Sequence, residues 1–195
     1  FNGITNGVVR LTGHDPANEH DVYTGEELKL LIDESTESGL IEPAQNEYVD
    51  NIFDLGDKDA EAIMTPRTEL TCLDMEDTLA ENRELAERYK YTRYPVCQGS
   101  KDHLVGFVHV KDLFMMDADA SMEDLPIREL YAVPESIPIA KLLQLLQRRH
   151  TKIAVVVDEH GGTAGIVTMS DIMEQIVGRV DDEYSHGLAD EIVKK

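Results

Sequence analysis

The chain has 195 residues, of which 39 are Asp or Glu and 18 are Lys or Arg, so its formal net charge is −21 with the histidines neutral. So large an acidic excess excludes a nucleic-acid-binding protein, which needs a basic face toward the phosphates. Apolar residues make up 42% of the chain, which excludes a disordered acidic tail and allows one domain or two small ones.

The N-terminal segment carries Ile4, Val8 and Leu11 at the spacing of one helix face. This pattern is typical of a frayed terminal helix, and it also fits the cytoplasmic end of a segment that leaves a membrane. The chain begins at Phe1 and runs to Lys195 without a final cap or turn motif. We therefore expect the sequence to be a piece of a longer protein.

Two helices are expected before the middle of the chain. Thr24 and Glu27 form a capping-box pattern that predicts a helix start, and Gly39 suits the end of that helix. Pro43 in a first turn predicts a second helix that reaches about Phe53. The apolar residues of both segments are spaced to form one buried stripe.

The rest of the chain contains a duplicated pattern. Residues 92–96 match residues 151–155, and residues 106–113 match residues 165–172, both with an offset of 59 residues and without a gap. Thr, Val, Gly, Val and Asp are identical at matched positions. A constant offset over two separate blocks indicates a duplicated structural unit.

Each copy has the pattern of a β-α-β-β-α unit, with apolar, β-branched strands around an amphipathic helix. The expected strands are residues 69–73, 94–97 and 104–109 in the first copy and 130–133, 153–157 and 164–168 in the second. The expected central helices are residues 78–90 and 137–149. One such unit is small for independent stability, so the two should pack as a pseudo-symmetric α+β pair.

This duplicated pattern resembles a tandem pair of cystathionine-β-synthase (CBS) domains, also called a Bateman module. Residues 165–171, Gly-Ile-Val-Thr-Met-Ser-Asp, carry the resemblance, and residues 106–112 are a weaker copy. Four further strings make the chain similar, more specifically, to the CorC/HlyC/CNNM (hemolysin-like) family of magnesium and cobalt transport proteins. These strings are residues 63–67, 91–96, 157–165 and 176–183.

The resemblance implies a division of the chain into four parts. Residues 1–56 would be a helical linker from a membrane domain, residues 57–119 the first CBS domain, and residues 120–180 the second. Residues 181–195 would be an acidic linker toward a C-terminal domain. The chain, soluble by itself, would lie at the cytoplasmic face of the cell membrane in the full-length protein and would form homodimers through its CBS pairs.

The resemblance also implies a site for an adenine nucleotide, AMP or ATP, with or without Mg²⁺. Asp171 can accept hydrogen bonds from a ribose diol, and the hydroxyls and amides at the start of its helix can meet phosphate oxygens. Arg93 adds a permanent positive charge for phosphate, and Tyr91 a flat face for adenine. The implied nucleotide-binding residues are Leu70, Tyr91, Thr92, Arg93, Tyr94, Pro95, Thr168, Ser170 and Asp171.

Each of these residues also has an ordinary structural explanation. Asp171 fits a first-turn acid that the helix dipole favours, Tyr91 a core residue, and Arg93 the partner of a surface carboxylate. The acidic residues concentrate outside the repeat, whereas Arg93 follows Arg88 and Lys90 closely. We therefore expect a locally basic patch at the nucleotide cleft.

A second cleft, related to the first by pseudo-symmetry, is predicted to be poorer. It would pair residues 150–152 with His109, Lys111 and Asp112. His109 occupies the position that Thr168 holds in the second copy, so a hydroxyl is missing there. We expect this second cleft to be weak or empty for nucleotides.

Catalysis has little support in the sequence. It contains no phosphate-binding loop motif and no recognisable arrangement of a nucleophile with a base. Asp158, Glu159 and His160 are consecutive, but they lie in an expected hairpin turn. Cys72 and Cys97 are 25 residues apart and have neither metal-site spacing nor the pattern of a disulfide framework.

The function that fits best is therefore binding and not catalysis. We expect an adenine-nucleotide-binding regulatory module in a protein of magnesium or cobalt transport or efflux. Two alternatives stay open at this point. One is a dimerisation module that needs no ligand, and the other is an acidic soluble protein that binds metal ions.

Overall fold

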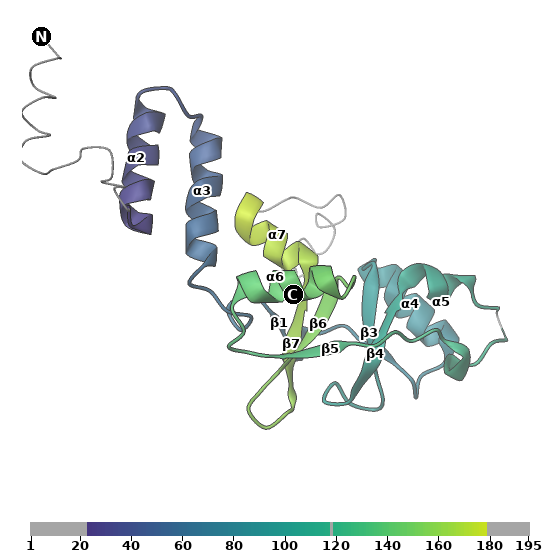
Figure 1. Cartoon of the computed structure of the whole chain (residues 1–195). Helices are drawn as coiled ribbons and strands as arrows, with labels where there is room; N and C mark the ends of the chain where they lie inside the picture. The colour runs from purple at the N-terminus through teal and green to yellow at the C-terminus, as the bar shows by residue number, and fades with distance from the viewer. Residues whose placement is uncertain (1–22, 118, 179–195) are drawn as a thin grey trace, which may run out of the picture. The chain divides into compact units, whose positions relative to one another are not determined.

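The computed structural model describes residues 23–117 and 119–178 (Figure 1). The chain divides into two compact units, residues 1–47 and residues 48–195, and the second unit contains both repeats. The apolar stripe predicted in residues 4–11 and the acidic linker predicted at the C-terminus lie outside the described residues. None of the helices in the described part is long and apolar enough to cross a membrane.

The first unit contains α2 (Gly25–Glu37) and the beginning of α3 (Pro43–Leu55). The predicted capping box is present: the Thr24 N–H donates to Glu27 Oε2 at 2.7 Å, and the Glu27 N–H donates to Thr24 Oγ1 at 3.3 Å. The chain leaves α2 through Gly39, whose φ of 77° is the left-handed conformation that favours glycine. Both predicted helices are thus confirmed, but the predicted burial of their apolar stripe is wrong: α2 has no buried residue, and Tyr48 and Ile52 of α3 are 44% and 54% exposed.

Each repeat in the second unit has the predicted order of strand, helix, strand, strand and helix. The first repeat consists of β2 (Leu73–Asp74), α4 (Leu79–Tyr89), β3 (Arg93–Cys97), β4 (Leu104–His109) and α5 (Val110–Met115). The second repeat consists of β5 (Tyr131–Pro134), α6 (Ile139–Arg148), β6 (Ile153–Val157), β7 (Thr163–Thr168) and α7 (Met169–Val177). Three short elements lie outside the repeats: β1 (Thr65–Pro66) and the 3₁₀ helix η1 (Arg67–Glu69) precede the first repeat, and the 3₁₀ helix η2 (Met122–Asp124) lies between the two.

The strands of the two repeats pair in the same way. In each repeat the first strand is parallel to the second, which is antiparallel to the third. The first repeat has the sheet order β2-β3-β4, whereas the second has the order β1-β7-β6-β5. β1 precedes the first repeat in the chain, yet it pairs with β7 of the second repeat. The segment ahead of the first repeat therefore completes the sheet of the second repeat.

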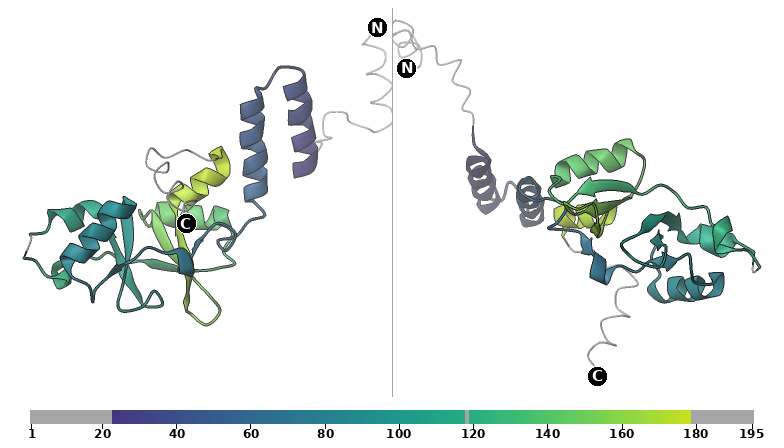
Figure 2. Two further views of the ribbon diagram at one scale, coloured as in Figure 1. Left: turned by 180° about the vertical axis from the view of Figure 1, so that it is seen from behind. Right: turned by 90° about the horizontal axis from the view of Figure 1, so that it is seen from below.

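Helices cover one face of each sheet, α4 and α5 in the first repeat and α6 and α7 in the second (Figures 1 and 2). In the second repeat, Leu142 and Leu146 of α6 and Ile172 of α7 are fully buried in one apolar cluster. The first repeat has an equivalent cluster, which includes Leu73, Leu79, Ala86, Tyr94, Val96, Val108 and Leu113. The predicted α+β pair is confirmed.

The first strand of the first repeat is shorter than predicted. We expected a strand over residues 69–73, but β2 begins only at Leu73. The residues before β2 form η1 and an extended segment, in which Leu70 packs with Ile166 of β7. This segment follows the strand pattern because its apolar side chains are buried against Cys97 and Leu104 of the first repeat and Ile166 of the second, although it has no ladder with β3.

A buried asparagine connects β2 to α4. Asn82 is 1% exposed, its Oδ1 accepts the Asp74 N–H at 2.9 Å, and its Nδ2 donates to the carbonyls of Asp74 and Thr78 at 2.9 and 3.1 Å. Asn82→Ala should lower the free energy of unfolding by about 2–4 kcal/mol, because three buried backbone bonds lose their partner. Urea unfolding measures this effect. Glu84→Ala, on the exposed side of the same helix, is the control, and an equal loss in both variants would contradict the prediction.

Candidate functional site

Asp171 lies at the start of α7 and is held there by Thr168. The N–H and the hydroxyl of Thr168 both donate to Asp171 Oδ2, at 2.6 and 2.9 Å, and the Asp171 N–H donates back to Thr168 Oγ1 at 3.3 Å. No described residue donates a hydrogen bond to Oδ1. Burial raises the pKa of the Asp171 carboxyl above its ordinary value, although the bonds from Thr168 act in the opposite direction. The carboxylate is thus fixed in place by Thr168 through one of its two oxygens.

The strand that leads to Thr168 is bordered by the segment ahead of the first repeat. Thr65 and Pro66 of β1 face Ile166 and Gly165 of β7 in the antiparallel ladder. Farther along, Leu70 is buried beside Ile166. The structure therefore brings one predicted site residue, Leu70, next to β7. Thr65 and Pro66, which border β7, are not among the predicted site residues, although both lie in a string that carries the family resemblance.

The tyrosines of the predicted site differ in their surroundings. Tyr94 is fully buried, and its hydroxyl donates to the Ala86 carbonyl at 3.1 Å and accepts the Tyr91 N–H at 2.8 Å. Tyr91 is 49% exposed, and its ring stacks on that of Tyr89 with centroids 6.0 Å apart. Tyr94 is therefore a core residue of the first repeat, whereas Tyr91 keeps a surface that a ligand can reach.

Thr92 and Arg93 lie at the start of β3, beside the first turn of α5. The Val110 N–H donates to the Thr92 carbonyl at 2.9 Å. The second repeat has the same bond, from the Met169 N–H to the Lys152 carbonyl at 2.9 Å. Each repeat thus places the start of its middle strand beside the start of its last helix. Within the described residues, no hydrogen bond or ion pair joins residues 91–95 to Thr168, Ser170 or Asp171.

The equivalent position in the first repeat has a different chemistry. Asp112, which matches Asp171, forms an ion pair with Arg128 at 2.5 Å. His109, which matches Thr168, accepts the Lys111 N–H on Nδ1 at 3.1 Å. Burial, followed by the positive charge of Arg93, lowers the pKa of His109. Arg93, Lys111 and Arg128 thus form a basic patch at the second cleft, whereas the sequence predicts a basic patch of Arg88, Lys90 and Arg93 at the nucleotide cleft.

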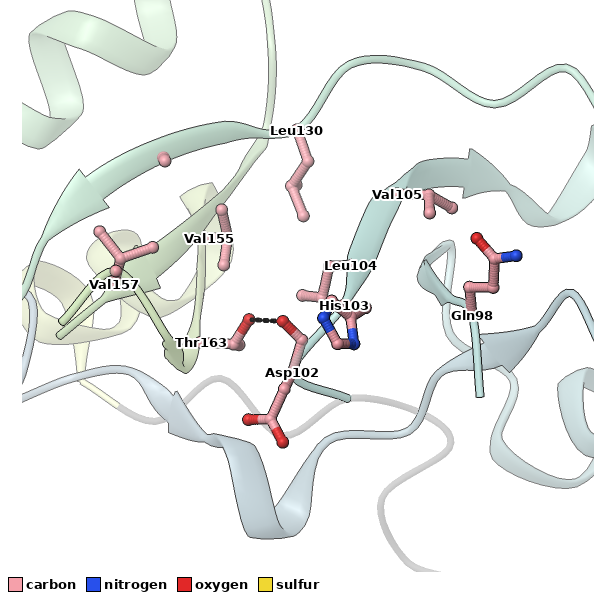
Figure 3. Close-up of a pocket in the computed structure, with 11 residues that line it drawn as sticks. Gln98, Asp102, His103, Leu104, Val105, Leu130, Val155, Val157 and Thr163 are labelled. Atoms are coloured by element: carbon pink, nitrogen blue, oxygen red, sulfur yellow. Dashed lines mark hydrogen bonds between the residues drawn. The ribbon is translucent and has the colours of Figure 1, made fainter. Parts of the chain in front are cut away.

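A cavity of about 570 Å³ lies between the two repeats, at the hairpin ends of the sheets (Figure 3). Thr163 Oγ1 donates to the Asp102 carbonyl at 3.5 Å across its lower side, and Asp102 also forms an ion pair with Arg67. None of the predicted site residues lines this cavity. Its lining residues are Gln98, Asp102, His103, Leu104, Val105, Leu130, Ala132, Val155, Val157, Gly161 and Thr163. The sequence predicts the two hairpin turns but carries no signal that they lie side by side.

Metal ligands do not gather in the described part of the chain. No group of three or more His, Cys, Asp or Glu side chains comes together there in the manner of a metal site. Cys72 and Cys97 are both buried free thiols, and burial raises the pKa of Cys97 to about 12. The arrangement around Asp171 is therefore the better candidate for a functional site, and its chemistry is hydrogen bonding to a polar ligand.

Comparison with known proteins identifies the class of fold first. A family model described as CBS domain matches residues 60–119 and again residues 122–178. The second unit therefore contains a tandem pair of CBS domains. The chain is 38% identical over 199 residues to the protein YugS of Bacillus subtilis and covers 46% of it. It is also 35% identical over 162 residues to the magnesium and cobalt efflux protein CorC of Escherichia coli, covering 56% of that protein with 82% of its own length.

Solved structures narrow the family further. The CBS domain of a bacterial CNNM/CorC family Mg²⁺ transporter is 37% identical, with a TM-score of 0.74, and is matched over its whole length by 83% of this chain. The same domain in complex with ATP gives a TM-score of 0.65 at 37% identity over 71% of this chain and all of that one. A CBS pair with bound AMP from Klebsiella pneumoniae is 30% identical, with a TM-score of 0.55. The match covers 62% of this chain and 98% of that one.

The chain belongs to the CBS-domain pairs of the CNNM/CorC family of Mg²⁺ transporters. It spans about half the length of the curated relatives it matches. The family and the fold predicted from the sequence are both confirmed.

Proposed function

We propose that this CBS pair binds an adenine nucleotide, AMP or ATP, and thereby regulates a membrane protein of magnesium or cobalt transport. The observation that carries the proposal is the Thr168–Asp171 capping box, which fixes the Asp171 carboxylate at the start of α7. Structures similar to this chain have been solved with ATP and with AMP, which supports a nucleotide as the ligand. The proposed position is the cytoplasmic face of the membrane, next to a transmembrane domain of the full-length protein.

In the proposed complex, Asp171 accepts hydrogen bonds from the two ribose hydroxyls. The Ser170 hydroxyl and the amides of the first turn of α7 face the phosphates, because the helix N-terminus favours negative charge. Arg93 adds a positive charge, and Mg²⁺ would offset phosphate charge beside a chain whose net charge is −21. The proposed lining of the base is the exposed ring of Tyr91 with Thr92, Pro95 and Leu70, while the buried Tyr94 holds the Tyr91 backbone through its hydroxyl.

Regulation follows if the ligand contacts both repeats. Residues 91–95 belong to the first repeat and Asp171 to the second, so a nucleotide that touches both favours one arrangement of the repeats over others. A ligand can shift such an equilibrium only by its difference in affinity for the two arrangements. A site built from residues of both repeats can give such a difference in affinity, because its ligand contacts each repeat.

A second candidate function is dimerisation without a ligand. Several large apolar side chains are exposed on the last helices of the two repeats, and Met115 is the most exposed of them at 82%. The others are Phe114, Met173 and Val177. Exposed apolar faces of this kind favour association of two copies. This function predicts a dimer whose stability does not change when a nucleotide is added.

Calorimetric titration tests the proposed function. Protein stripped of copurified nucleotide is titrated with AMP and with ATP, with and without Mg²⁺. Asp171→Ala should weaken binding at least about tenfold, because a charged hydrogen-bond partner is lost. Glu84→Ala, which removes an exposed carboxylate on α4, is the control and should keep the affinity within about threefold. The absence of binding to the stripped protein, or an unchanged affinity in Asp171→Ala, would overturn the proposal.

A further inference from the structure

The two repeats have diverged at their matched functional positions. With the 59-residue offset, Thr168, Ser170 and Asp171 of the second repeat correspond to His109, Lys111 and Asp112 of the first. The second repeat therefore presents two hydroxyls and a carboxylate that has no ion-pair partner among the described residues. The first repeat presents an imidazole and an ammonium group, and its carboxylate is already paired.

Three cationic side chains lie near His109 in the first repeat. Arg93 on β3 is the ladder partner of His109 on β4. Lys111 follows in the first turn of α5. Arg128 comes from the segment before β5, whose backbone bridges Phe107, and the Arg128 guanidinium reaches Asp112 at 2.5 Å. The groups thus come from three separate parts of the fold.

The local charge is opposite to that of the whole chain. The electrostatic neighbours of His109 are Arg93, Lys111, Arg128 and Asp112, which amount to three permanent positive charges and one negative charge. The chain as a whole carries −21. The Arg128 and Asp112 side chains are 48% and 26% exposed, so an ion from solvent can reach the cluster. A local positive excess in a strongly acidic protein favours an anionic ligand.

The ion pair of Asp112 with Arg128 favours a phosphate over a ribose group at this site. Arg128 holds Asp112 Oδ2 and compensates its charge, so Asp112 is a weaker acceptor for a ribose diol than Asp171, which has no ion-pair partner among the described residues. Guanidinium and ammonium groups are typical phosphate ligands. We propose that Arg93, Lys111 and Arg128 form a phosphate-binding site in the first repeat, beside His109. The phosphate is either a terminal group of the nucleotide bound at Asp171, in which case the inference rests on the proposed function, or part of a separate molecule.

Titration with inorganic triphosphate, AMP and ATP tests this site, each at low and at physiological salt. Lys111→Ser places in the first repeat the residue that the second repeat has, and it leaves the Arg128–Asp112 pair intact. Arg128→Gln removes the other exposed cation. Each variant should weaken triphosphate binding about tenfold. Lys141→Ser, an exposed site on α6, removes one positive charge elsewhere and is the control.

The nucleotide titrations identify the source of the phosphate. If both variants weaken ATP but not AMP, the site holds a terminal phosphate of the bound nucleotide. If they weaken triphosphate and leave ATP and AMP unchanged, the site holds a separate phosphate compound. Triphosphate and ATP binding equal to wild type in both variants, or an equal loss in Lys141→Ser, would overturn the inference. Wild-type protein that binds triphosphate but neither nucleotide would overturn the proposed function alone.

Discussion

Gly165→Ala should destabilise the CBS pair by about 3 kcal/mol or more. An added Cβ at Gly165 would lie 2.3 Å from the Thr65 carbonyl oxygen and 3.0 Å from Met64 Sδ. The nearest of these atoms belongs to the backbone of β1, which pairs with β7 at this point. A backbone strand cannot rotate away as a side chain can, so the substitution must break the pairing or displace the whole segment.

The matched glycine of the first repeat has the same role. A Cβ at Gly106 would lie 2.4 Å from the Arg128 carbonyl oxygen and 2.4 Å from Ile127 Cγ2. Both glycines therefore lie where the segment that leads into one repeat crosses the last strand of the other. We expect Gly106→Ala to destabilise the pair to a similar extent. Both copies of the repeat thus have glycine at this position because a larger residue would clash with the crossing segment.

Urea unfolding at fixed pH measures both effects, and Gly161→Ala provides the control. Gly161 has a φ of 81° in the β6–β7 turn, and no heavy atom lies within 4 Å of its added Cβ. This control should cost only about 1 kcal/mol, from backbone strain. If Gly165→Ala were no less stable than Gly161→Ala, the crossing segment would be held more loosely than the structure indicates.

The parts of the fold that the sequence predicts correctly depend on short-range patterns. The capping box at Thr24 needs only residues three apart, and the repeat needs only the offset of 59 residues. The pairing of β1 with β7 was not predicted. β1 has two residues, and its partner lies about a hundred positions away, so neither periodicity nor composition reports it. The cavity at the hairpin ends was missed for the same reason, since both hairpins must meet to form it.

In the candidate site too, the sequence predicts contacts between neighbouring residues but not contacts that depend on the fold. The bond between Thr168 and Asp171 spans three positions at a helix start, so its pattern is visible in the sequence. The full burial of Tyr94 depends on the fold of α4 over β3, and nothing in residues 91–95 distinguishes it from the exposed Tyr91. The ion pair of Asp112 with Arg128 joins residues 16 apart and different elements, so the divergence of the two repeats becomes visible only in the structure.

Asp171→Asn should separate ligand binding from stability. An asparagine side-chain oxygen can still accept the Thr168 N–H, so the start of α7 keeps its cap. The negative charge that the ribose hydroxyls would donate to is gone, so nucleotide affinity should fall about tenfold or more. The variant should nevertheless be at least as stable as wild type at neutral pH, because a half-buried charge costs free energy that a neutral amide does not.

The pH dependence of stability tests this reasoning, because folding raises the pKa of Asp171. A carboxyl with a raised pKa favours the folded state below its unfolded pKa of about 3.9, and this contribution is lost as the pH rises through the folded value. Asp171→Asn lacks the titrating group. Its free energy of unfolding relative to wild type should therefore increase between about pH 4 and pH 7. The neighbouring Glu174 carboxylate acts in the same direction, since it further disfavours a charged Asp171.

Unfolding curves of both proteins at several pH values give this difference directly. Asp112→Asn is the matched control, because it removes a carboxylate that is paired with Arg128, and it should gain no stability as the pH rises. A relative stability of Asp171→Asn that falls with rising pH would show that the Thr168 hydrogen bonds outweigh burial. If instead the variant is more stable and binds nucleotide poorly, Asp171 costs the fold stability at neutral pH. Such a cost is expected of a residue retained for its ligand and not for its fold.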